Sequence, residues 1–186
     1  MASKTVEPGA AERHDPAVHT LVRASGSGLV TGADADALYE CFRDFGGWSR
    51  WLPEVPFELQ GGGRGTEVGA LRAVVFARGD KWLLERLDAL DDNARRCTYS
   101  GVNYGVTAAG EAPYPLSASP FPGGLFVDYS STVTVHAVTV PAAPRAAFMT
   151  WTGEVWCKPE HAGALRDFLT AFYEGNVVKL NAYFAR

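Results

Sequence analysis

Short connections between strand-like runs in the middle of the chain constrain the fold most strongly. These runs, at 57–60, 71–76, 82–90 and 95–102, are separated by segments rich in glycine, aspartate and asparagine. Consecutive parallel strands need a crossover of about a dozen residues or more, usually a helix, and these connections are shorter. The pattern therefore predicts an antiparallel meander.

The N-terminal part predicts one strand followed by two short helices. We expect the first strand over 18–30, with a bulge or a strong bend where serine and glycine alternate at Ser25–Gly28. Asp34 can cap a helix whose apolar residues recur at spacings of three and four, namely Leu38, Cys41, Phe42 and Phe45. A second short helix is expected over 48–52, because Pro53 stops it.

The C-terminal part predicts two more strands and a long helix. The strands are expected over 126–140 and 147–157. An amphipathic helix opens at Pro159, and Asn176 falls within its apolar stripe of Leu165, Phe168, Leu169, Phe172 and Leu180. The proline- and glycine-rich segment 103–124 is longer than most loops, which predicts either a lid or a mobile excursion, and we expect part of it to border the mouth of a pocket.

The composition describes an ordinary globular domain. Of 186 residues, 47% are hydrophobic and 20% are charged, which suits one domain over 17–186. Residues 1–16 are small, polar and punctuated by prolines, so we expect them to be disordered. The formal charge of -4, without a lysine or arginine run, argues against nucleic acid or an anionic membrane as the partner. We expect a small-molecule ligand, with a homodimer left open.

The cysteines and histidines show no disulfide or metal pattern. Cys41, Cys97 and Cys157 are an odd number without a C-x-x-C spacing, so we expect free thiols in a reducing compartment, the cytoplasm. The four histidines are scattered, and the turn near Gly61 lacks the lysine of a phosphate loop. We therefore expect no metal and no other cofactor. No apolar run has the length of a membrane span, so membrane insertion is not expected.

An arginine and a glutamate occupy apolar positions on neighbouring predicted strands. Arg72 shares a strand face with Phe76, and Glu85 shares one with Leu87, whereas Leu84 falls on the wetter face of its strand. A carboxylate on an apolar face is costly unless it is paired, so the arginine is its natural partner. Two interpretations stay open: an ion pair inside a pocket, or a surface cross-strand pair contributing about 0.2 to 1 kcal/mol.

The order of these elements resembles the START/Bet v 1-like superfamily, which includes polyketide cyclase/dehydrase proteins. The resemblance is carried by Phe45–Pro53, Gly69-Ala70-Leu71-Arg72, Glu85–Asp92 and Asp128-Tyr129-Ser130-Ser131. It implies an α+β helix-grip fold, in which a curved antiparallel sheet wraps around a long C-terminal helix and two short helices follow the first strand. It also implies a largely apolar cavity for one small molecule.

Two branches of this superfamily share the arginine and glutamate strands with the chain. In the plant abscisic-acid receptors, a Ser-Gly-Leu-Pro-Ala gate stands where this sequence has 76–80, and their His-Arg-Leu latch has no match here. Their hormone-binding lysine would fall near 58–60, which contains no lysine, so a hormone receptor is not expected. The lachrymatory-factor synthase type isomerises a sulfenic acid with an arginine and a glutamate that Arg72 and Glu85 resemble. Tyr129 resembles a tyrosine of that pocket.

The residue chemistry suits proton transfer. A glutamate in a cavity can act as general base, a guanidinium can hold an oxyanion, and a phenol can donate to developing negative charge. With Glu85, Arg72 and Tyr129 in these roles, the chain would be a cofactor-independent isomerase, cyclase or lyase. The alternative is a non-catalytic carrier or sensor of a small hydrophobic ligand, because the fold hosts both classes.

We expect a pocket of about 300 to 1,000 Å³. Its substrate-binding residues are expected to be Phe76, Leu87, Tyr99, Trp151, Phe172 and Asn176. The aromatic residues among them can instead be ordinary packing residues, and Asn176 can instead satisfy a backbone group of the sheet.

Overall fold

The computed structural model describes residues 14–75, 81–106, 127–139, 141 and 145–186, with 81–82 and 103–106 as backbone only. The described strands form one antiparallel sheet of seven, in the order β1-β7-β6-β5-β4-β3-β2. Their bounds are β1 (Thr20–Thr31), β2 (Phe57–Leu59), β3 (Leu71–Val75), β4 (Lys81–Asp91), β5 (Arg96–Val106), β6 (Asp128–Ala137) and β7 (Ala146–Cys157). The antiparallel meander predicted from the short connections is confirmed.

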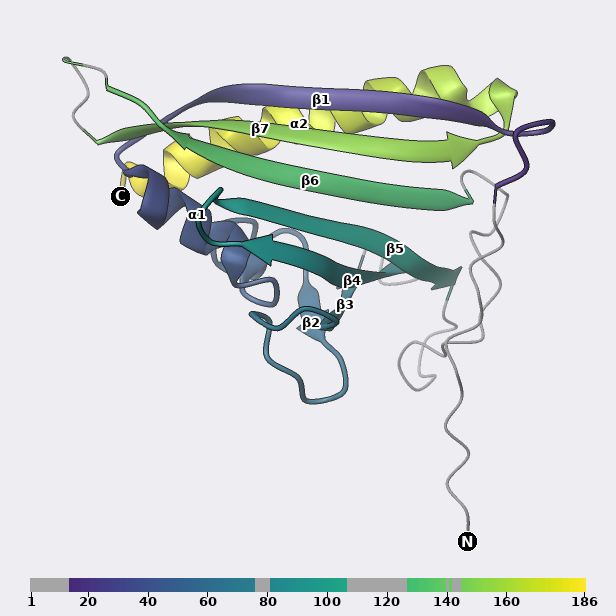
Figure 1. Ribbon diagram of the computed structural model, residues 1–186, viewed down its shortest axis with the longest axis horizontal. Helices are drawn as coiled ribbons and strands as arrows, with labels where there is room; N and C mark the ends of the chain where they lie inside the picture. Colours follow the sequence, from purple (N-terminus) through teal and green to yellow (C-terminus); the bar gives the residue numbers. More distant parts are fainter. Residues whose placement is uncertain (1–13, 76–80, 107–126, 140, 142–144) are drawn as a thin grey trace, which may run out of the picture.

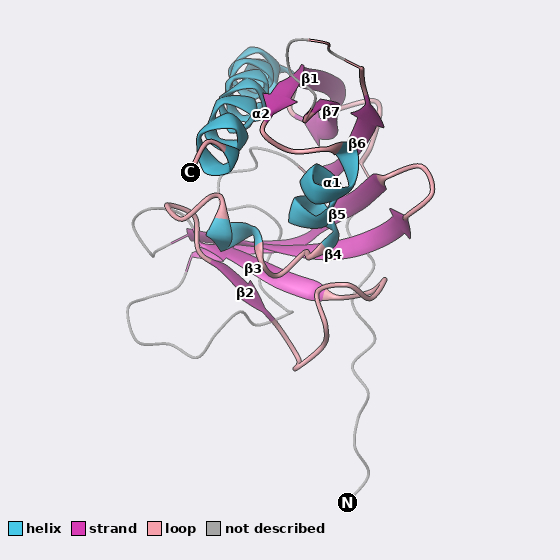
Figure 2. Cartoon of the chain, turned by 90° about the vertical axis from the view of Figure 1, so that its left-hand side faces the viewer, coloured by secondary structure: helices cyan, strands magenta, loops and turns pink. Residues whose placement is uncertain are grey.

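Two α-helices accompany the described sheet, α1 (Ala35–Arg43) and α2 (Ala162–Phe184). Single turns of 3-10 helix, η1 (Trp48–Arg50) and η2 (Pro159–His161), lie beside them. The long α2 runs beside β1 and β7 (Figure 1). The sheet is curved, with β1, β7 and β6 towards one end and β2 at the other, and α1 lies on its concave side (Figure 2). This is the helix-grip arrangement that the sequence predicts.

The first helix begins where a side chain satisfies its free backbone N–H groups. The Oδ1 atom of Asp34 accepts the backbone N–H of Ala37 at 2.9 Å, which makes Asp34 the N-cap. The helix buries Leu38 and Phe42 against the sheet, as their spacing predicts. Together, the cap and the apolar face fix where α1 begins and which side of it packs on the sheet.

The first strand corrects one prediction. The pairing between β1 and β7 runs without a register shift from Thr20 to Thr31, so the expected bulge at Ser25–Gly28 is wrong. The two glycines serve a different purpose, because a Cβ at Gly26 would lie 2.7 Å from the Tyr173 Cβ. A Cβ at Gly28 would lie as close to Val177. These glycines let α2 pack directly on the backbone of β1.

The register shifts occur in β4 instead. The ladder between β4 and β5 is irregular at Leu84/Glu85 and again at Leu87/Ala89. Leu84 is 1% exposed, so its expected place on a wetter face is wrong. It pairs with Ala73, which is also buried, and the adjacent pair of Arg72 and Glu85 on the other face is buried too, so both faces of the sheet are covered at this point.

The segment expected to be a lid or a mobile excursion overlaps the end of a strand. β5 continues to Val106, so the first residues of 103–124 belong to a strand. The remainder lies outside the described residues, as does most of the expected N-terminal disordered segment. At the border of that segment, the ring of His14 stacks on Trp156 with centroids 3.8 Å apart.

Candidate functional site

A cavity of about 370 Å³ lies between the sheet and α2. Strands β2 to β7, α2 and the segment around η1 contribute its walls. The lining is mostly apolar, and its charged or phenolic members are Arg72, Glu85, Tyr99, Tyr129, Glu54 and Lys179. Ligand pockets usually span roughly 300 to 1,000 Å³, so this one suits a compact molecule.

Arg72 and Glu85 form an ion pair within this lining. They are directly opposed in the antiparallel register of β3 and β4. The Arg72 Nε and Nη2 atoms lie 2.8 Å and 2.6 Å from the same oxygen, Glu85 Oε2. The side chains are 1% and 5% exposed. Of the two interpretations that the sequence leaves open, the structure matches the internal pair.

Aromatic rings enclose the guanidinium. The Arg72 Cζ atom lies 3.7 Å from the ring centroids of Phe45 and Trp48 and 4.6 Å from that of Phe57. Its Nη1 donates to the Phe45 carbonyl at 2.8 Å. These contacts compensate part of the lost hydration. Three of the five guanidinium N–H groups are therefore used by described residues.

Glu85 has one engaged oxygen. Both contacts from Arg72 reach Oε2, and no described residue hydrogen-bonds to Oε1. Burial raises the pKa of Glu85 above its ordinary value, while the charge and hydrogen bonds of Arg72 oppose that change without cancelling it. A carboxyl group of raised basicity in a ligand-sized cavity can accept a proton once it is ionised.

Two phenols line the cavity near this pair. The ring centroid of Tyr99 on β5 lies 5.2 Å from the Arg72 Cζ, and Tyr129 on β6 packs edge-on against Tyr99. Burial raises the pKa of each phenol well above its ordinary value, so both stay protonated in the working pH range. Protonated phenols can act as hydrogen-bond donors to a ligand.

A second ion pair lines the cavity on its solvent-accessible side. Lys179 on α2 contacts Glu54, and their side chains are 40% and 51% exposed. The hydrogen bond from Lys179 lowers the pKa of the Glu54 carboxyl. Together with the buried pair, this contact balances the charges of the described lining, with two cations matched by two carboxylates.

Five of the nine predicted site residues line the cavity: Arg72, Glu85, Tyr99, Tyr129 and Phe172. Phe76 lies outside the described residues. The other three are fully buried and do not belong to the described lining, which corrects the expectation for them: Leu87, Trp151 and Asn176.

The reason differs for each of these three residues. Leu87 and Trp151 are packed in the core, where the Trp151 ring stacks on Tyr173 at 5.1 Å. Asn176 lies on the α2 stripe between Phe172 and Lys179, which do line the cavity. Its amide is sealed off, and no described residue hydrogen-bonds to its Oδ1 or Nδ2.

Sequence reasoning missed several residues of this site. Trp48 was expected only as the start of a short helix, yet its ring covers the guanidinium of Arg72. Tyr173 is fully buried and bonds to Ser131, but it falls beside the apolar stripe rather than within it. Glu54 and Lys179 resemble ordinary surface charges, and no local pattern marks them as partners.

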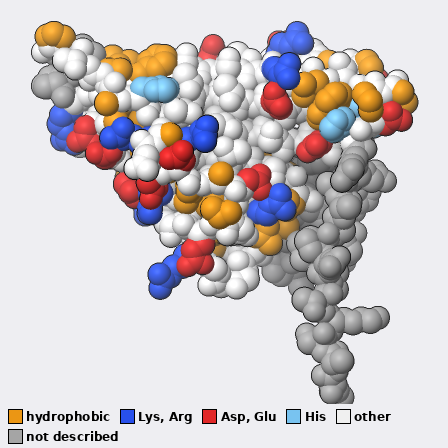
Figure 3. Space-filling model, viewed as in Figure 1, with side chains coloured by type: hydrophobic (Ala, Val, Ile, Leu, Met, Phe, Trp, Pro, Cys, Tyr) orange, Lys and Arg blue, Asp and Glu red, His pale blue; other side chains and the backbone are white. Residues whose placement is uncertain are grey.

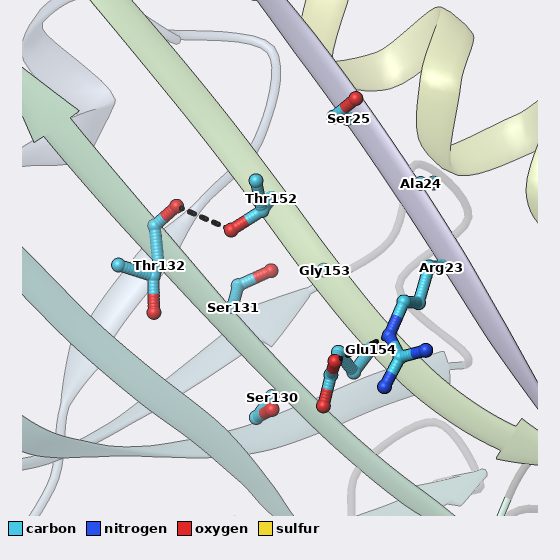
Figure 4. Close-up of a pocket in the computed structure, with 9 residues that line it drawn as sticks. All are labelled: Arg23, Ala24, Ser25, Ser130, Ser131, Thr132, Thr152, Gly153 and Glu154. Atoms are coloured by element: carbon cyan, nitrogen blue, oxygen red, sulfur yellow. Dashed lines mark hydrogen bonds and ion pairs between the residues drawn. The ribbon is translucent and has the colours of Figure 1, made fainter.

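A hollow on the opposite face of the sheet has different chemistry. It has a volume of about 540 Å³ and lies over β1, β6 and β7 (Figure 4). Arg23 pairs there with Glu154 at 2.7 Å, and Thr152 donates to the Thr132 carbonyl at 3.4 Å. Its charged side chains are largely exposed, and both signs of charge are interspersed over this side of the molecule (Figure 3). We therefore take the enclosed cavity as the candidate site.

Other site types find no support in the described part of the chain. Among its residues, no group of three or more His, Cys, Asp or Glu side chains is arranged to hold a metal ion. The three cysteines are buried free thiols. None of the described helices has both the length and the hydropathy needed to cross a membrane.

Solved structures similar to this one share its fold at low sequence identity. The protein XoxI from Bacillus cereus is 19% identical with a TM-score of 0.66, over 88% of this chain and 96% of that one. A protein from Thermobifida fusca is 24% identical with a TM-score of 0.64, over 88% and 93%. Norcoclaurine synthase from Thalictrum flavum, solved with dopamine and hydroxybenzaldehyde, is 15% identical with a TM-score of 0.64, over 99% and 95%.

Sequence comparison agrees with the fold. No curated protein is similar enough in sequence to count as a match. The family model described as polyketide cyclase / dehydrase and lipid transport matches residues 22–185. That span runs from the first strand to the end of α2 and includes every described residue of the cavity. The chain therefore belongs to the polyketide cyclase / dehydrase and lipid transport family.

Proposed function

We propose that this protein is a cofactor-independent isomerase, cyclase or lyase that acts on a small, partly apolar molecule in the cavity beneath α2. The observation that carries the proposal is the buried Glu85, whose Oε2 is held by Arg72 and whose Oε1 has no partner among the described residues. A structural ion pair has no need to border a ligand-sized space, and this one does.

Glu85 is the general base in this proposal. Its carboxylate removes a proton from the substrate through Oε1 and returns it at another atom, or passes it to a leaving group. Burial makes the carboxylate more basic than a glutamate in water, and this supports proton abstraction from a weak acid. The isomerisation, cyclisation and elimination steps differ in where the proton goes afterwards.

Arg72 and Tyr129 complete the proposed machinery. Arg72 holds the carboxylate in position and keeps its positive charge next to the anion that forms on the substrate. Tyr129 lines the same cavity and supplies a phenolic donor. The apolar walls exclude water, which strengthens these interactions during the reaction.

The second candidate is a carrier or sensor that binds such a molecule without converting it. The mostly apolar lining favours this alternative, since retention of a hydrophobic ligand needs little more. The family description itself covers both enzymes and lipid transport. Substitution of Glu85 separates the two candidates.

The test begins with native mass spectrometry of freshly purified protein and extraction of any retained small molecule. Turnover of the extracted compound is then measured for the parent protein, Glu85→Gln and Glu154→Gln. General-base catalysis typically accelerates a reaction by about 10²- to 10⁴-fold. Glu85→Gln is therefore expected to bind the compound and to lower turnover roughly 100-fold or more. Glu154→Gln removes the carboxylate of the exposed Arg23 pair and serves as the matched control.

Arg72→Leu is expected to weaken both binding and turnover. A folded Glu85→Gln variant that works at the parental rate would rule out the catalytic role of Glu85. If the parent protein binds the compound and never consumes it, while Glu85→Gln changes only affinity, the protein is a carrier.

A further inference from the structure

The hydroxyl groups behind the cavity have a fixed hydrogen-bond direction. Ser131 Oγ donates to the Tyr129 hydroxyl at 2.9 Å and also lies 2.8 Å from the Tyr173 hydroxyl. A serine hydroxyl carries one proton. Since that proton goes to Tyr129, Tyr173 must be the donor to Ser131. The sequence of donors is therefore Tyr173 to Ser131 to Tyr129.

The hydroxyl oxygen of the other cavity phenol, Tyr99, also accepts a hydrogen bond from a residue outside the cavity lining. The indole Nε1 of Trp151 lies 3.1 Å from the Tyr99 hydroxyl, and an indole N–H can only donate. The Tyr99 oxygen thus already accepts a hydrogen bond from Trp151, and the Tyr129 oxygen already accepts one from Ser131. Tyr99 can therefore still donate its own proton.

The proton of Tyr99 is available to the cavity. Apart from the adjacent phenol of Tyr129, none of the described residues offers it an acceptor. The Tyr129 oxygen already accepts a hydrogen bond from Ser131, which leaves it one lone pair for Tyr99, so a ligand oxygen competes with a partly occupied acceptor. Both phenols line the cavity, and Tyr99 is the one whose ring lies within 5.2 Å of the Arg72 Cζ.

The fold leaves space for this arrangement. Gly153 on β7 lies opposite Ser131 in the register of β6 and β7. A Cβ at Gly153 would collide with the hydroxyl of Tyr173. The absence of a side chain there lets Tyr173 reach across from α2 to Ser131.

Building on the proposed function, we infer that Tyr99 donates the hydrogen bond that holds the ligand, and that the ligand presents a neutral acceptor oxygen, a carbonyl, to this end of the cavity. Trp151 and Ser131 are positioning residues, because they occupy the two phenol oxygens and direct the Tyr99 proton inward, and Tyr173 is one because it orients Ser131. The charge balance of the lining supports a neutral ligand. Arg72 is paired with Glu85 and Lys179 with Glu54, so the described lining has no unpaired cation for an acid.

The test uses three ring compounds of the same size class: 1-tetralone with a carbonyl, tetralin, which differs from it only in lacking the carbonyl, and 1-naphthoate, a two-ring carboxylate with a negative charge. Binding is measured by tryptophan fluorescence, since Trp48 lines the cavity. One net hydrogen bond corresponds to roughly a two- to tenfold difference in affinity, so 1-tetralone is expected to bind that much more tightly than tetralin. Naphthoate is expected to bind most weakly of the three.

Infrared difference spectra of carbonyl-labelled 1-tetralone identify the donor. In the parent protein, the bound carbonyl band is expected at a lower frequency than in an apolar solvent. Tyr99→Phe should remove both the shift and the preference over tetralin, while Ser131→Ala and Tyr173→Phe should reduce the shift in part. Matched controls are Tyr39→Phe, whose hydroxyl bonds to Asp92 outside the cavity, and Ser130→Ala, the half-buried neighbour of Ser131 on β6.

The outcomes separate this inference from the proposed function. If tetralin and 1-tetralone bind equally, or if the band shift survives in Tyr99→Phe, the inference is wrong while the cavity remains a ligand site. If none of the ring compounds binds, both the inference and the proposed function are wrong. Should Tyr99→Phe fail to fold, the band shift in Ser131→Ala decides, and an unchanged shift there overturns the inference.

Discussion

Two arginine–carboxylate pairs in the same sheet show how solvent changes an otherwise similar interaction. Arg23 opposes Glu154 across β1 and β7, and Arg72 opposes Glu85 across β3 and β4. Their Nε-to-oxygen distances are 2.7 Å and 2.8 Å. The first pair is 71% and 52% exposed, whereas the second is 1% and 5% exposed.

The comparison shows that burial, rather than geometry, gives the inner pair its chemistry. In water each charge of the outer pair can be hydrated if its partner leaves, so the pair adds little to stability. Inside the protein an unpaired charge cannot be hydrated in this way, so it strongly destabilises the folded state. The same lack of water raises the pKa of Glu85, which is the property that a general base in this cavity would use.

Removal of the arginine from each pair is expected to give the largest contrast. Arg72→Leu leaves a buried carboxylate without its partner and should lower the free energy of unfolding by about 3 to 5 kcal/mol. Arg23→Leu should lower it by about 1 kcal/mol or less, since Glu154 stays in water. Urea denaturation of both variants measures the two values. Equal losses of unfolding free energy in the two variants would mean that burial does not change what each pair contributes to stability.

The pH dependence of stability should give the next largest contrast. Because the pKa of Glu85 is raised in the folded protein, the native state holds its proton more tightly than the unfolded chain does. Its contribution to the free energy of unfolding is therefore complete below the ordinary pKa of a glutamate and is lost as pH rises through the raised folded pKa. A tenfold difference in proton affinity between the two states corresponds to about 1.4 kcal/mol.

Urea titrations across this pH range test the assignment with the two Glu→Gln variants. The decline in stability with rising pH should be present in the parent protein and in Glu154→Gln, and should be absent in Glu85→Gln. A decline that persists in Glu85→Gln would assign it to another group.

Salt should produce the smallest effect. At about 1 M ionic strength charges are screened beyond roughly 3 Å in water, which weakens exposed pairs and affects buried ones much less. A double-mutant cycle on Arg23 and Glu154 should give a coupling of about 0.2 to 1 kcal/mol at low salt and close to zero at high salt. The cycle on Arg72 and Glu85 should change little. Equal loss of both couplings in salt would mean that water reaches the inner pair.

The parts of this fold that depend on neighbours in sequence could be predicted from the sequence. The Asp34 cap and the order of the meander strands are local patterns that the structure contains. The apolar stripe of α2 is present in part, since Leu169 and Leu180 are buried whereas Phe168 is 59% exposed. The opposition of Arg72 and Glu85 also follows from the pairing of two strands that are consecutive in the sequence.

Contacts between distant segments could not be predicted in the same way. The glycines of β1 resemble a bulge until it is known that α2 packs on them. Alternation places Leu87, Trp151 and Asn176 on inward-facing positions, but it cannot say that other side chains separate them from the cavity. The contact between Glu54 and Lys179 joins two segments that no sequence period relates.

The close packing of α2 on β1 affects where the cavity can open at the lower cost in free energy. At Gly26, Gly28 and Gly32 the helix meets the strand so closely that a single added carbon would collide with it. The opposite wall, which includes Glu54 and Val55, meets α2 at the water-exposed pair of Glu54 and Lys179. Breaking an exposed pair costs about 1 kcal/mol or less, whereas parting α2 from β1 would open a packed interface. Of these two described walls, the one at Lys179 and Glu54 is therefore expected to open at the lower cost, with the helix staying in place.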